Sequence, residues 1–201
     1  MDVGGIPLIL ASASPRRKEI LEAHGFKPIV IPAGVDENIP EDASFTPGET
    51  TMYLAELKAA SVLKVLGTEE WPQGCAILGV DTIVYKDRII GKPSDEADAL
   101  DILRSLKNAS HEVISGVCII HALPSRGKLA ITEKLIFFDT TTVRFGDYTD
   151  DEILAYIRAN PPYDKSGSYA IQSDWGRHVL EIDGDIENVI GLPFKKVSLY
   201  I

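Results

Sequence analysis

Two long strand-forming segments constrain the fold more than any other feature of the sequence. Residues 111–122 and 128–145 are both strand-like, and a short turn containing proline and glycine separates them at 124–127. A connection this short joins antiparallel strands, because parallel strands need a crossover of about a dozen residues or more. Residues 75–85 form a third, largely apolar strand. The chain is therefore expected to build its sheet around a long antiparallel hairpin.

Helical segments alternate with these strands. A serine or threonine precedes each expected helix, at Ser14, Thr46, Ser94 and Thr149. These residue types are favoured there because their side-chain oxygen accepts a hydrogen bond from a free N–H of the first turn. At Thr46 and Thr149, a glutamate three positions later completes a capping box. Together with short strands at residues 8–11 and 29–31, this alternation predicts an α/β fold with a mixed sheet.

Length and charge exclude several classes of protein. A chain of 201 residues indicates one domain over residues 1–201, with room for two lobes. Its 20 Lys+Arg and 30 Asp+Glu give a net charge of −10, so nucleic acids and anionic membranes are not expected as partners. No apolar run approaches the ~18 residues that span a bilayer. The apolar stretch at 6–11 is short and follows the acidic Asp2, whereas a signal peptide carries positive charge before its apolar region. A secretory signal peptide is therefore not expected.

The two cysteines, Cys75 and Cys118, are too few for a disulfide framework or a four-cysteine zinc site. They are expected to be small core residues in a reducing compartment. The cytoplasm is therefore the expected location.

The segment Ser12-Ala13-Ser14-Pro15-Arg16-Arg17 places hydroxyl groups and two arginines where a strand meets a helix N-terminus. Free N–H groups and the helix dipole make such a junction a natural anion site, and arginine adds forked donors. A solvated basic first turn is the alternative interpretation. However, cations are disfavoured at a helix N-terminus, which indicates that an anionic ligand compensates for them.

Asp81 follows an apolar strand, and an unpaired buried carboxylate is costly. Its partner could be a divalent ion, a catalytic water or the cap of a nearby helix. Glu37, after Asp36 in an early loop, offers a second hard oxygen ligand. Lys58 interrupts an Ala/Leu-rich helix face and Lys92 lies between glycine and proline. Taken singly, each of these residues fits a surface charge as well as a site.

A second acidic motif offers a different interpretation. Asp183-Gly184-Asp185 follows the apolar residues 179–182 and is similar to the start of the motif of aspartate-nucleophile phosphatases. A turn between two short strands explains the same acids. The four histidines lack metal-ligand spacing, and the Gly-x-Ser-x-Gly elbow is absent from the sequence.

Taken together, these residues resemble the Maf family of nucleoside triphosphate pyrophosphatases, over nearly the whole chain. The departures are small: Ser115 replaces the usual threonine, and Ala170 and Ser173 replace glycines of the late loop. The matching segments, in chain order, are Leu10-Ala11-Ser12-Ala13-Ser14-Pro15-Arg16-Arg17, Val35-Asp36-Glu37, Lys58-Ala59, Gly79-Val80-Asp81-Thr82-Ile83-Val84, Gly91-Lys92-Pro93, His111-Glu112-Val113, Ser115-Gly116-Val117, Asp164-Lys165-Ser166-Gly167, Ile171-Gln172 and Asn188-Val189-Ile190-Gly191-Leu192-Pro193.

The resemblance implies an inosine triphosphatase-like fold, with a long mixed sheet in two lobes and a central cleft. It also implies hydrolysis of a nucleoside triphosphate to the monophosphate and pyrophosphate, with water attacking the α-phosphorus and a divalent cation, Mg²⁺ or Mn²⁺, screening the phosphate charge. A homodimer is expected by analogy with the family. The implied site comprises Asp81 as proton acceptor, Glu37 and Asp81 at the metal, and Ser14, Arg16, Arg17, Lys58, Thr82, Lys92 and Gln172 as substrate contacts.

One subgroup of the family acts on dTTP and UTP, and this chain matches its pattern at Arg16-Arg17, Asp81-Thr82 and Ile171-Gln172. Thr82 and Gln172 offer short donors and acceptors that suit the polar edge of a pyrimidine. The resemblance therefore implies dTTP and UTP, with modified pyrimidine nucleotides such as 5-methyl-UTP, as substrates. Two other classes stay open at this point: an aspartate-nucleophile phosphatase centred on Asp183, and a non-catalytic nucleotide-binding module that regulates division.

Overall fold

The computed structural model describes residues 5–40 and 43–201 of the chain. The strands are β1 (Leu8–Leu10), β2 (Ile29–Val30), β3 (Cys75–Lys86), β4 (Arg88–Ile90), β5 (Ser110–Ser125), β6 (Lys128–Phe145) and β7 (Val179–Asp183). The α-helices are α1 (Pro15–Ala23), α2 (Pro47–Val65), α3 (Glu96–Leu106), α4 (Asp150–Ala159), α5 (Ile186–Ile190) and α6 (Phe194–Val197). Two short 3₁₀ helices, η1 (Ser166–Ser168) and η2 (Asp174–His178), lie between α4 and β7.

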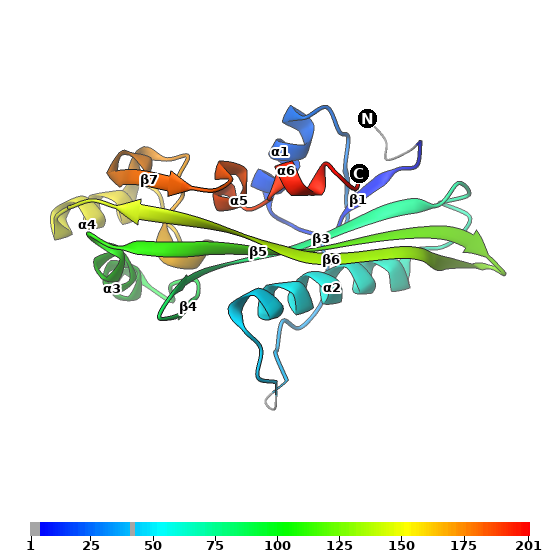
Figure 1. Cartoon of the computed structure of the whole chain (residues 1–201), viewed down its shortest axis with the longest axis horizontal. Helices are drawn as coiled ribbons and strands as arrows, with labels where there is room; N and C mark the ends of the chain where they lie inside the picture. Colours follow the sequence, from blue (N-terminus) through cyan, green and yellow to red (C-terminus); the bar gives the residue numbers. More distant parts are fainter. Residues whose placement is uncertain (1–4, 41–42) are drawn as a thin grey trace.

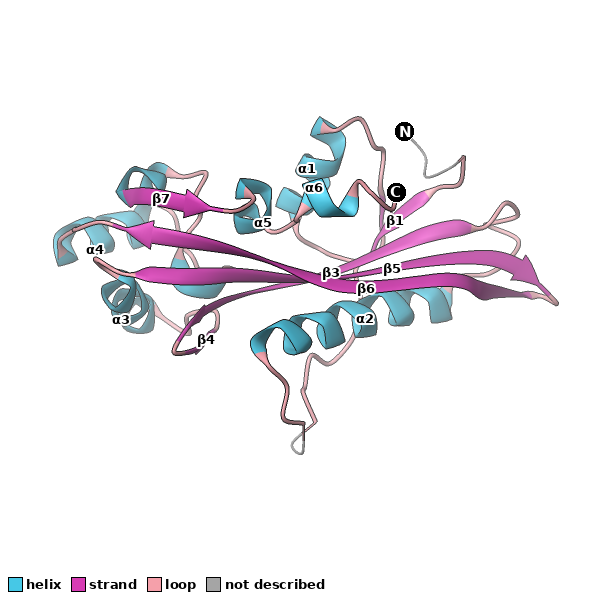
Figure 2. Ribbon diagram, viewed as in Figure 1, coloured by secondary structure: helices cyan, strands magenta, loops and turns pink. Residues whose placement is uncertain are grey.

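All seven strands belong to one mixed sheet (Figure 2). Six of them follow the order β2-β1-β3-β5-β6-β7, and β4 pairs with the far end of β3. β1 is parallel to β2 and β3, whereas β3 pairs antiparallel with β4 and β5, β5 with β6, and β6 with β7. The predicted mixed α/β sheet and the hairpin of β5 and β6 are confirmed, and β6 has the bounds expected from the sequence.

Helices cover the sheet differently at its two ends (Figure 1). At one end, α2 packs on one face while α1 and α6 cover the other; with β1 and β2 they form the first lobe. At the other end, β4, α3, α4, β7 and the two 3₁₀ helices form the second lobe. β3, β5 and β6 run through both lobes. Each face of the first lobe has its own apolar core, and a third, aromatic-rich core fills the second lobe.

Two glycines let α2 approach the sheet closely. A Cβ at Gly79 of β3 would lie 2.2 Å from the carbonyl oxygen of Ala55, and one at Gly116 of β5 would lie 2.1 Å from the backbone of Thr51. Any larger residue at these positions would push the helix outward, because the interior is close-packed. The close contact matters for function, because α2 carries Lys58 toward β3.

The capping boxes predicted at Thr46 and Thr149 are both present. Ser14 is the N-cap residue of α1, but its side chain makes no capping hydrogen bond. The expectation that Ser94 caps α3 is wrong: Asp95 is the N-cap and accepts from the N–H of Asp98, whose carboxylate in turn accepts from Ser94. A carboxylate one position later outcompetes the serine hydroxyl.

The turn after β7 leads into the short helix α5, not into a second strand. The loop expected at 35–44 is without regular structure at 35–40 and 43–44, and its residues 41–42 lie outside the described part, as does Asp2. Among residues 5–40 and 43–201, helices long and apolar enough to cross a membrane are absent.

Candidate active site

The candidate site is a cleft that opens where β3 changes its neighbour. On one edge of β3, β1 pairs with the strand as far as Leu78, and β4 pairs with it from Val84 onward. Between these positions, Asp81, Thr82 and Ile83 line a cleft of about 570 Å³. Ligands of α/β proteins commonly bind at such a break, beyond the carboxyl ends of parallel strands.

All nine site residues inferred from the sequence line this cleft, and they come from both lobes. The first lobe contributes the β1–α1 junction, the loop after β2 and helix α2. The second lobe contributes the loop after β4 and the segment between η1 and η2. The nine residues are Ser14, Arg16, Arg17, Glu37, Lys58, Asp81, Thr82, Lys92 and Gln172.

A lysine joins two carboxylates at the floor of the cleft. Lys58 Nζ lies 2.6 Å from Asp81 Oδ1 and 3.0 Å from Glu37 Oε1. The side chains of Lys58 and Asp81 are 11% and 10% exposed, whereas that of Glu37 is 51% exposed. Asp81 is therefore a nearly buried carboxylate whose burial is tolerated because the ammonium group of Lys58 compensates its charge.

Adjacent residues of β3 serve opposite faces of the sheet, as the strand period requires. Asp81 faces α2 and its lysine, while Thr82 faces α1 and its arginine. The break in strand pairing lets both side chains reach the same cleft. This explains why two consecutive polar residues interrupt an otherwise apolar strand.

Arg17 holds the junction between β1 and α1. Its Nη1 donates to Ser12 Oγ at 2.7 Å, its Nη2 to Thr82 Oγ1 at 3.0 Å, and its Nε to the carbonyl oxygen of Gly191 at 2.8 Å. Burial lowers the pKa of Arg17 to about 10, and the charge of Asp81 opposes that shift. The guanidinium stays charged at neutral pH, and it links β1, β3 and the residue after α5.

Arg16 reaches across the cleft to the second lobe. Its Nη1 lies 3.3 Å from Asp164 Oδ2, and Lys165 also pairs with that carboxylate. Burial opposes ionisation of Asp164, but its hydrogen bonds and charge interactions with Lys165 and Arg16 outweigh burial and lower the pKa of the carboxyl. Asp164 and Lys165 are not predicted as site residues from the sequence, although both belong to a segment that matches the family pattern.

Apolar side chains and a turn also line the cleft. Ala170 O accepts from Ser173 N at 3.1 Å and from Ser173 Oγ at 2.6 Å, which closes a tight turn with Ile171 and Gln172 at its tip. An apolar wall beside a few polar groups suits a flat ring with polar edges. The apolar residues that line the cleft include Val84, Val113, Tyr169, Ile171, Val189 and Ile190.

His111 is a buried residue that supports this wall. It donates to or accepts from Tyr169, with Nε2 and Oη 2.8 Å apart, and burial with the charge of Lys86 lowers the pKa of His111 to about 4. Neutral at pH 7, it is a structural partner of a cleft residue. Its sequence signal, a lone histidine in an apolar strand, carries no information about its partner.

The acids of the alternative phosphatase motif lie elsewhere. Asp183 is exposed at the end of β7, and Asp185 caps α5 through a 2.9 Å hydrogen bond from Glu187 N to its Oδ1. Neither residue is among those that line the cleft. Helix capping accounts for Asp185 without catalysis.

A divalent ion would have two carboxylate ligands in this cleft. Asp81 and Glu37 approach the same ammonium group, so one cation can contact both. Within residues 5–40 and 43–201, clusters of three or more His, Cys, Asp or Glu that could hold a metal are absent. Mg²⁺ is commonly bound by one or two carboxylates, with water and substrate phosphates completing its shell, so this donor set fits it.

Comparison with known proteins gives close relatives over most of the chain. It is 40% identical over 191 residues to a dTTP/UTP pyrophosphatase of Bacillus cereus (strain AH187), covering 94% of this chain and 91% of the relative. It is 40% identical, with the same coverage, to a dTTP/UTP pyrophosphatase of Bacillus thuringiensis subsp. konkukian (strain 97-27). A protein of the same name from Bacillus anthracis (strain CDC 684 / NRRL 3495) is 40% identical, again over 94% and 91%.

Among solved structures, the fold is similar to the structure of the Staphylococcus aureus Ham1 protein, with a TM-score of 0.37 and 14% identity over 70% of this chain and 72% of that one. The sequence profile of the family described as Maf-like protein matches residues 7–201, which contain the whole cleft. With this match and relatives at 40% identity, the chain belongs to the Maf-like protein family.

Proposed function

We propose that this protein is a nucleoside triphosphate pyrophosphatase that hydrolyses dTTP and UTP to the monophosphate and pyrophosphate. One observation carries the proposal: a single cleft of about 570 Å³ is lined by a cluster of basic side chains, by two carboxylates and by a group of apolar side chains. Relatives named dTTP/UTP pyrophosphatase, 40% identical over most of the chain, support the same activity. The basic residues are Arg16, Arg17, Lys58 and Lys92, and the carboxylates are Glu37 and Asp81.

Asp81 is the proposed proton acceptor for the attacking water. A general base needs a carboxylate fixed near the reacting phosphorus, and Asp81 is held by Lys58 at 2.6 Å on a rigid strand. The water oxygen forms a bond to the α-phosphorus while the bond to the bridging oxygen breaks and pyrophosphate leaves. The proton of the water passes to Asp81 Oδ.

Arg16 and Lys92 are proposed to hold the phosphate chain, because these two basic residues line the cleft from opposite lobes. Charge develops on the phosphate oxygens and the leaving group as the bond breaks, so fixed cations stabilise the transition state. Arg17, engaged with Ser12, Thr82 and Gly191, shapes the junction and adds positive potential. Ser14, the N-cap residue of α1, is proposed as a further contact to the substrate.

Asp81 and Glu37 are proposed to hold a divalent cation, Mg²⁺ or Mn²⁺, with Lys58 as their partner when the cation is absent. When bound, the ion would neutralise charge on the phosphate oxygens. Hard carboxylate oxygens suit both ions.

Gln172 is the proposed contact to the polar edge of the base, because it is exposed at the tip of a turn that lines the cleft. Thr82 lines the same cleft, and its hydroxyl is bonded to Arg17 and 2.9 Å from Ser115 Oγ. A site that hydrogen-bonds a base discriminates strongly, because the wrong base leaves buried polar groups unpaired. We expect poor activity on ATP, GTP and 7-methyl-GTP. The proposal includes the cytoplasm as location and a homodimer as assembly.

Anion-exchange chromatography of a dTTP digest tests the activity. The proposed reaction gives dTMP and pyrophosphate, whereas a phosphatase gives dTDP and orthophosphate, and a binding module leaves dTTP intact. Parallel digests of UTP, ATP and 7-methyl-GTP test the choice of base. A kcat/KM for 7-methyl-GTP above those for dTTP and UTP would overturn the choice of base but not the type of reaction.

A further inference from the structure

The turn formed by residues 170–173, which presents Ile171 and Gln172 to the cleft, is bound from behind by a side chain that does not itself reach the cleft. The N–H of Ala170 donates to Tyr156 Oη at 3.0 Å. Tyr156 belongs to α4 of the second lobe, and it is absent from the residues that line the cleft. This hydrogen bond therefore joins the backbone of the turn to a helix behind it.

Tyr156 is well placed to fix the turn, because its own position is fixed. Its side chain is buried in the aromatic core of the second lobe, and its ring centroid lies 4.8 Å from that of Trp175. A buried aromatic ring packed in this way has little rotational freedom, so its hydroxyl marks a defined point in space. The turn is tied to that point by its first residue.

The chain is also anchored just before the turn and at the last residue of the turn. Before it, the Tyr169 hydroxyl bonds to His111 on β5. After it, Ser173 Oγ accepts from the N–H of Trp175 at the start of η2. Between these anchors, the orientation of the Ala170 peptide sets the direction of Ile171 and Gln172, and Tyr156 holds that peptide.

We propose that Tyr156 is a positioning residue for base selectivity: its hydroxyl holds the 170–173 turn so that Gln172 meets the pyrimidine edge. The inference rests on the proposed function. In this proposal, Tyr156 affects which nucleotide the cleft accepts, and it takes no part in the hydrolysis step at the α-phosphorus. Loss of the hydroxyl leaves the Ala170 N–H without its acceptor, so the turn samples other orientations.

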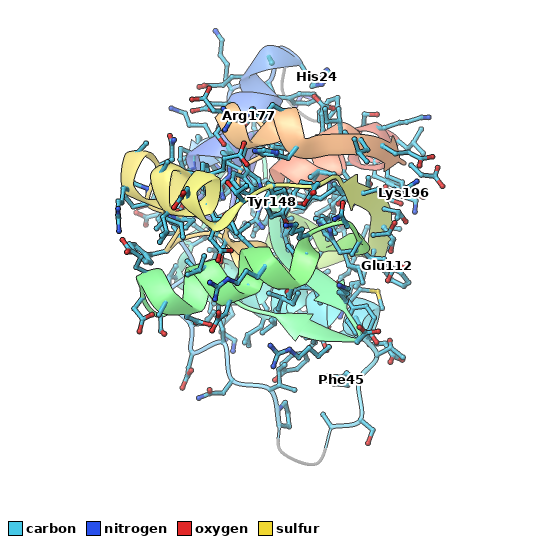
Figure 3. The ribbon with its side chains drawn as sticks, turned by 90° about the vertical axis from the view of Figure 1, so that its left-hand side faces the viewer. His24, Phe45, Glu112, Tyr148, Arg177 and Lys196 are labelled. Carbon is cyan, nitrogen blue, oxygen red and sulfur yellow. The ribbon has the colours of Figure 1, made fainter. Side chains whose placement is uncertain are left out.

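Tyr156→Phe is the test variant, and Tyr148→Phe is its matched control. Tyr148 is buried in the same aromatic core, with its ring centroid also 4.8 Å from that of Trp175, and lies at the centre of the second lobe in Figure 3. Its hydroxyl donates to Leu103 O of α3 at 2.7 Å and not to the turn. Both variants delete one hydroxyl of the same aromatic core. A difference between them therefore reflects the loss of the hydrogen bond to the turn and not a general effect on core stability.

Hydrogen exchange of the ligand-free proteins is the first readout. In Tyr156→Phe, the amides of residues 170–173 should exchange about three- to tenfold faster than in wild type, the loss expected for one hydrogen bond. In Tyr148→Phe, their exchange should match wild type. Equal exchange of these amides in both variants would contradict the proposal.

Selectivity is the second readout. Tyr156→Phe should lower the ratio of kcat/KM for dTTP to that for ATP about three- to tenfold, mainly through a higher KM for dTTP, with kcat nearly unchanged. Tyr148→Phe should keep the wild-type ratio. An unchanged ratio in Tyr156→Phe overturns the proposal, even where exchange is faster. A fall in kcat alone also overturns it.

The proposed function can fail separately. If wild-type protein binds dTTP without hydrolysing it, the pyrophosphatase assignment is wrong, and the ratio of the Kd values for dTTP and ATP replaces the kinetic ratio. A loss of that binding preference in Tyr156→Phe alone then supports the positioning role, and equal preference in both variants refutes it.

Discussion

Lys58 Nζ lies 2.6 Å from Asp81 Oδ1, so α2 and β3 are joined by a nearly buried ion pair at the floor of the cleft. The pair exists because Gly79 and Gly116 let the helix approach the sheet. It holds the proposed general base in place before any nucleotide binds. Glu37 Oε1 lies 3.0 Å from the same ammonium group. In our proposal, a divalent cation binds the two carboxylates and the phosphate chain pairs with the basic side chains.

Asp81→Asn should keep the fold and abolish hydrolysis of dTTP. The amide has almost the same shape, but it cannot accept a proton from water, so kcat should fall at least ~10²-fold. Asp183→Asn is the control, because Asp183 is exposed on β7 outside the cleft. If Asp183→Asn lost activity and Asp81→Asn kept it, the phosphatase interpretation would replace ours. Steady-state release of dTMP measures both.

Lys58→Met should change how the protein responds to metal. Removing the ammonium leaves Asp81 and Glu37 without their partner, and breaking a buried ion pair typically costs about 3 kcal/mol or more of unfolding free energy. Mg²⁺ should restore part of that loss by binding the folded state. Urea unfolding in EDTA and in excess Mg²⁺ measures the effect. Lys64→Met, exposed on the same helix, should show neither change, and a Lys58→Met protein indifferent to Mg²⁺ would remove the metal from this pair.

Arg16→Ala and Lys92→Ala should lower kcat/KM for dTTP about 10- to 100-fold, the loss typical of a charge-assisted hydrogen bond in the transition state. Lys196→Ala should have wild-type kinetics. Lys196 pairs with Asp139 at 2.8 Å and is not among the residues that line the cleft. It lies toward one edge of the molecule in Figure 3. Equal kinetics of the three variants would show that the overall charge, and not a site, affects the reaction.

The buried His111 should make stability depend on pH. Burial, with the charge of Lys86, lowers its pKa to about 4, while the unfolded chain has a value near 6.5. Between these values the unfolded state binds a proton that the folded state rejects, so stability is present above pH 6.5 and is lost as the pH falls toward 4. The full loss is about 3 kcal/mol.

His111→Gln should remove most of that pH dependence, because glutamine does not titrate and can still bond to Tyr169. His121→Gln, on the same strand, is the control and should keep it. Thermal unfolding between pH 4 and 7.5 compares the three proteins. A His111→Gln protein with the wild-type slope would assign the acid sensitivity to other groups.

Local features of the fold follow from the sequence because their causes are local. The capping boxes at Thr46 and Thr149 each need only two residues three positions apart, and both are present. The segment after β7 forms the helix α5 where the sequence indicated a strand, because a short apolar run fits either structure. The choice is made by tertiary contacts such as the two hydrogen bonds from Asn188 Nδ2 to Val113 O and Thr141 Oγ1.

The site is less predictable from local reasoning. Asp81, Lys58 and Glu37 are weak signals taken singly. Their residue types suggest Glu37 as a second ligand beside Asp81, but only the family pattern adds Lys58 to the group. The packing of α2 on β3 brings Lys58 to Asp81. The pairs Arg16–Asp164 and Tyr156–Ala170 join segments that are distant in the chain or separated by an irregular loop. No spacing rule predicts such contacts, because they depend on the tertiary packing: Arg16–Asp164 on how the two lobes meet, and Tyr156–Ala170 on how the turn packs on α4.

Hydrolysis of dTTP in water enriched in ¹⁸O tests the central claim most directly. Water that attacks the α-phosphorus leaves its oxygen in the monophosphate, so mass spectrometry should find one ¹⁸O atom in dTMP and none in the released pyrophosphate. Asp81→Asn should form neither product at a comparable rate. Label in pyrophosphate would mean attack at the β-phosphorus, and label in orthophosphate with formation of dTDP would mean a phosphatase; either result would contradict the account.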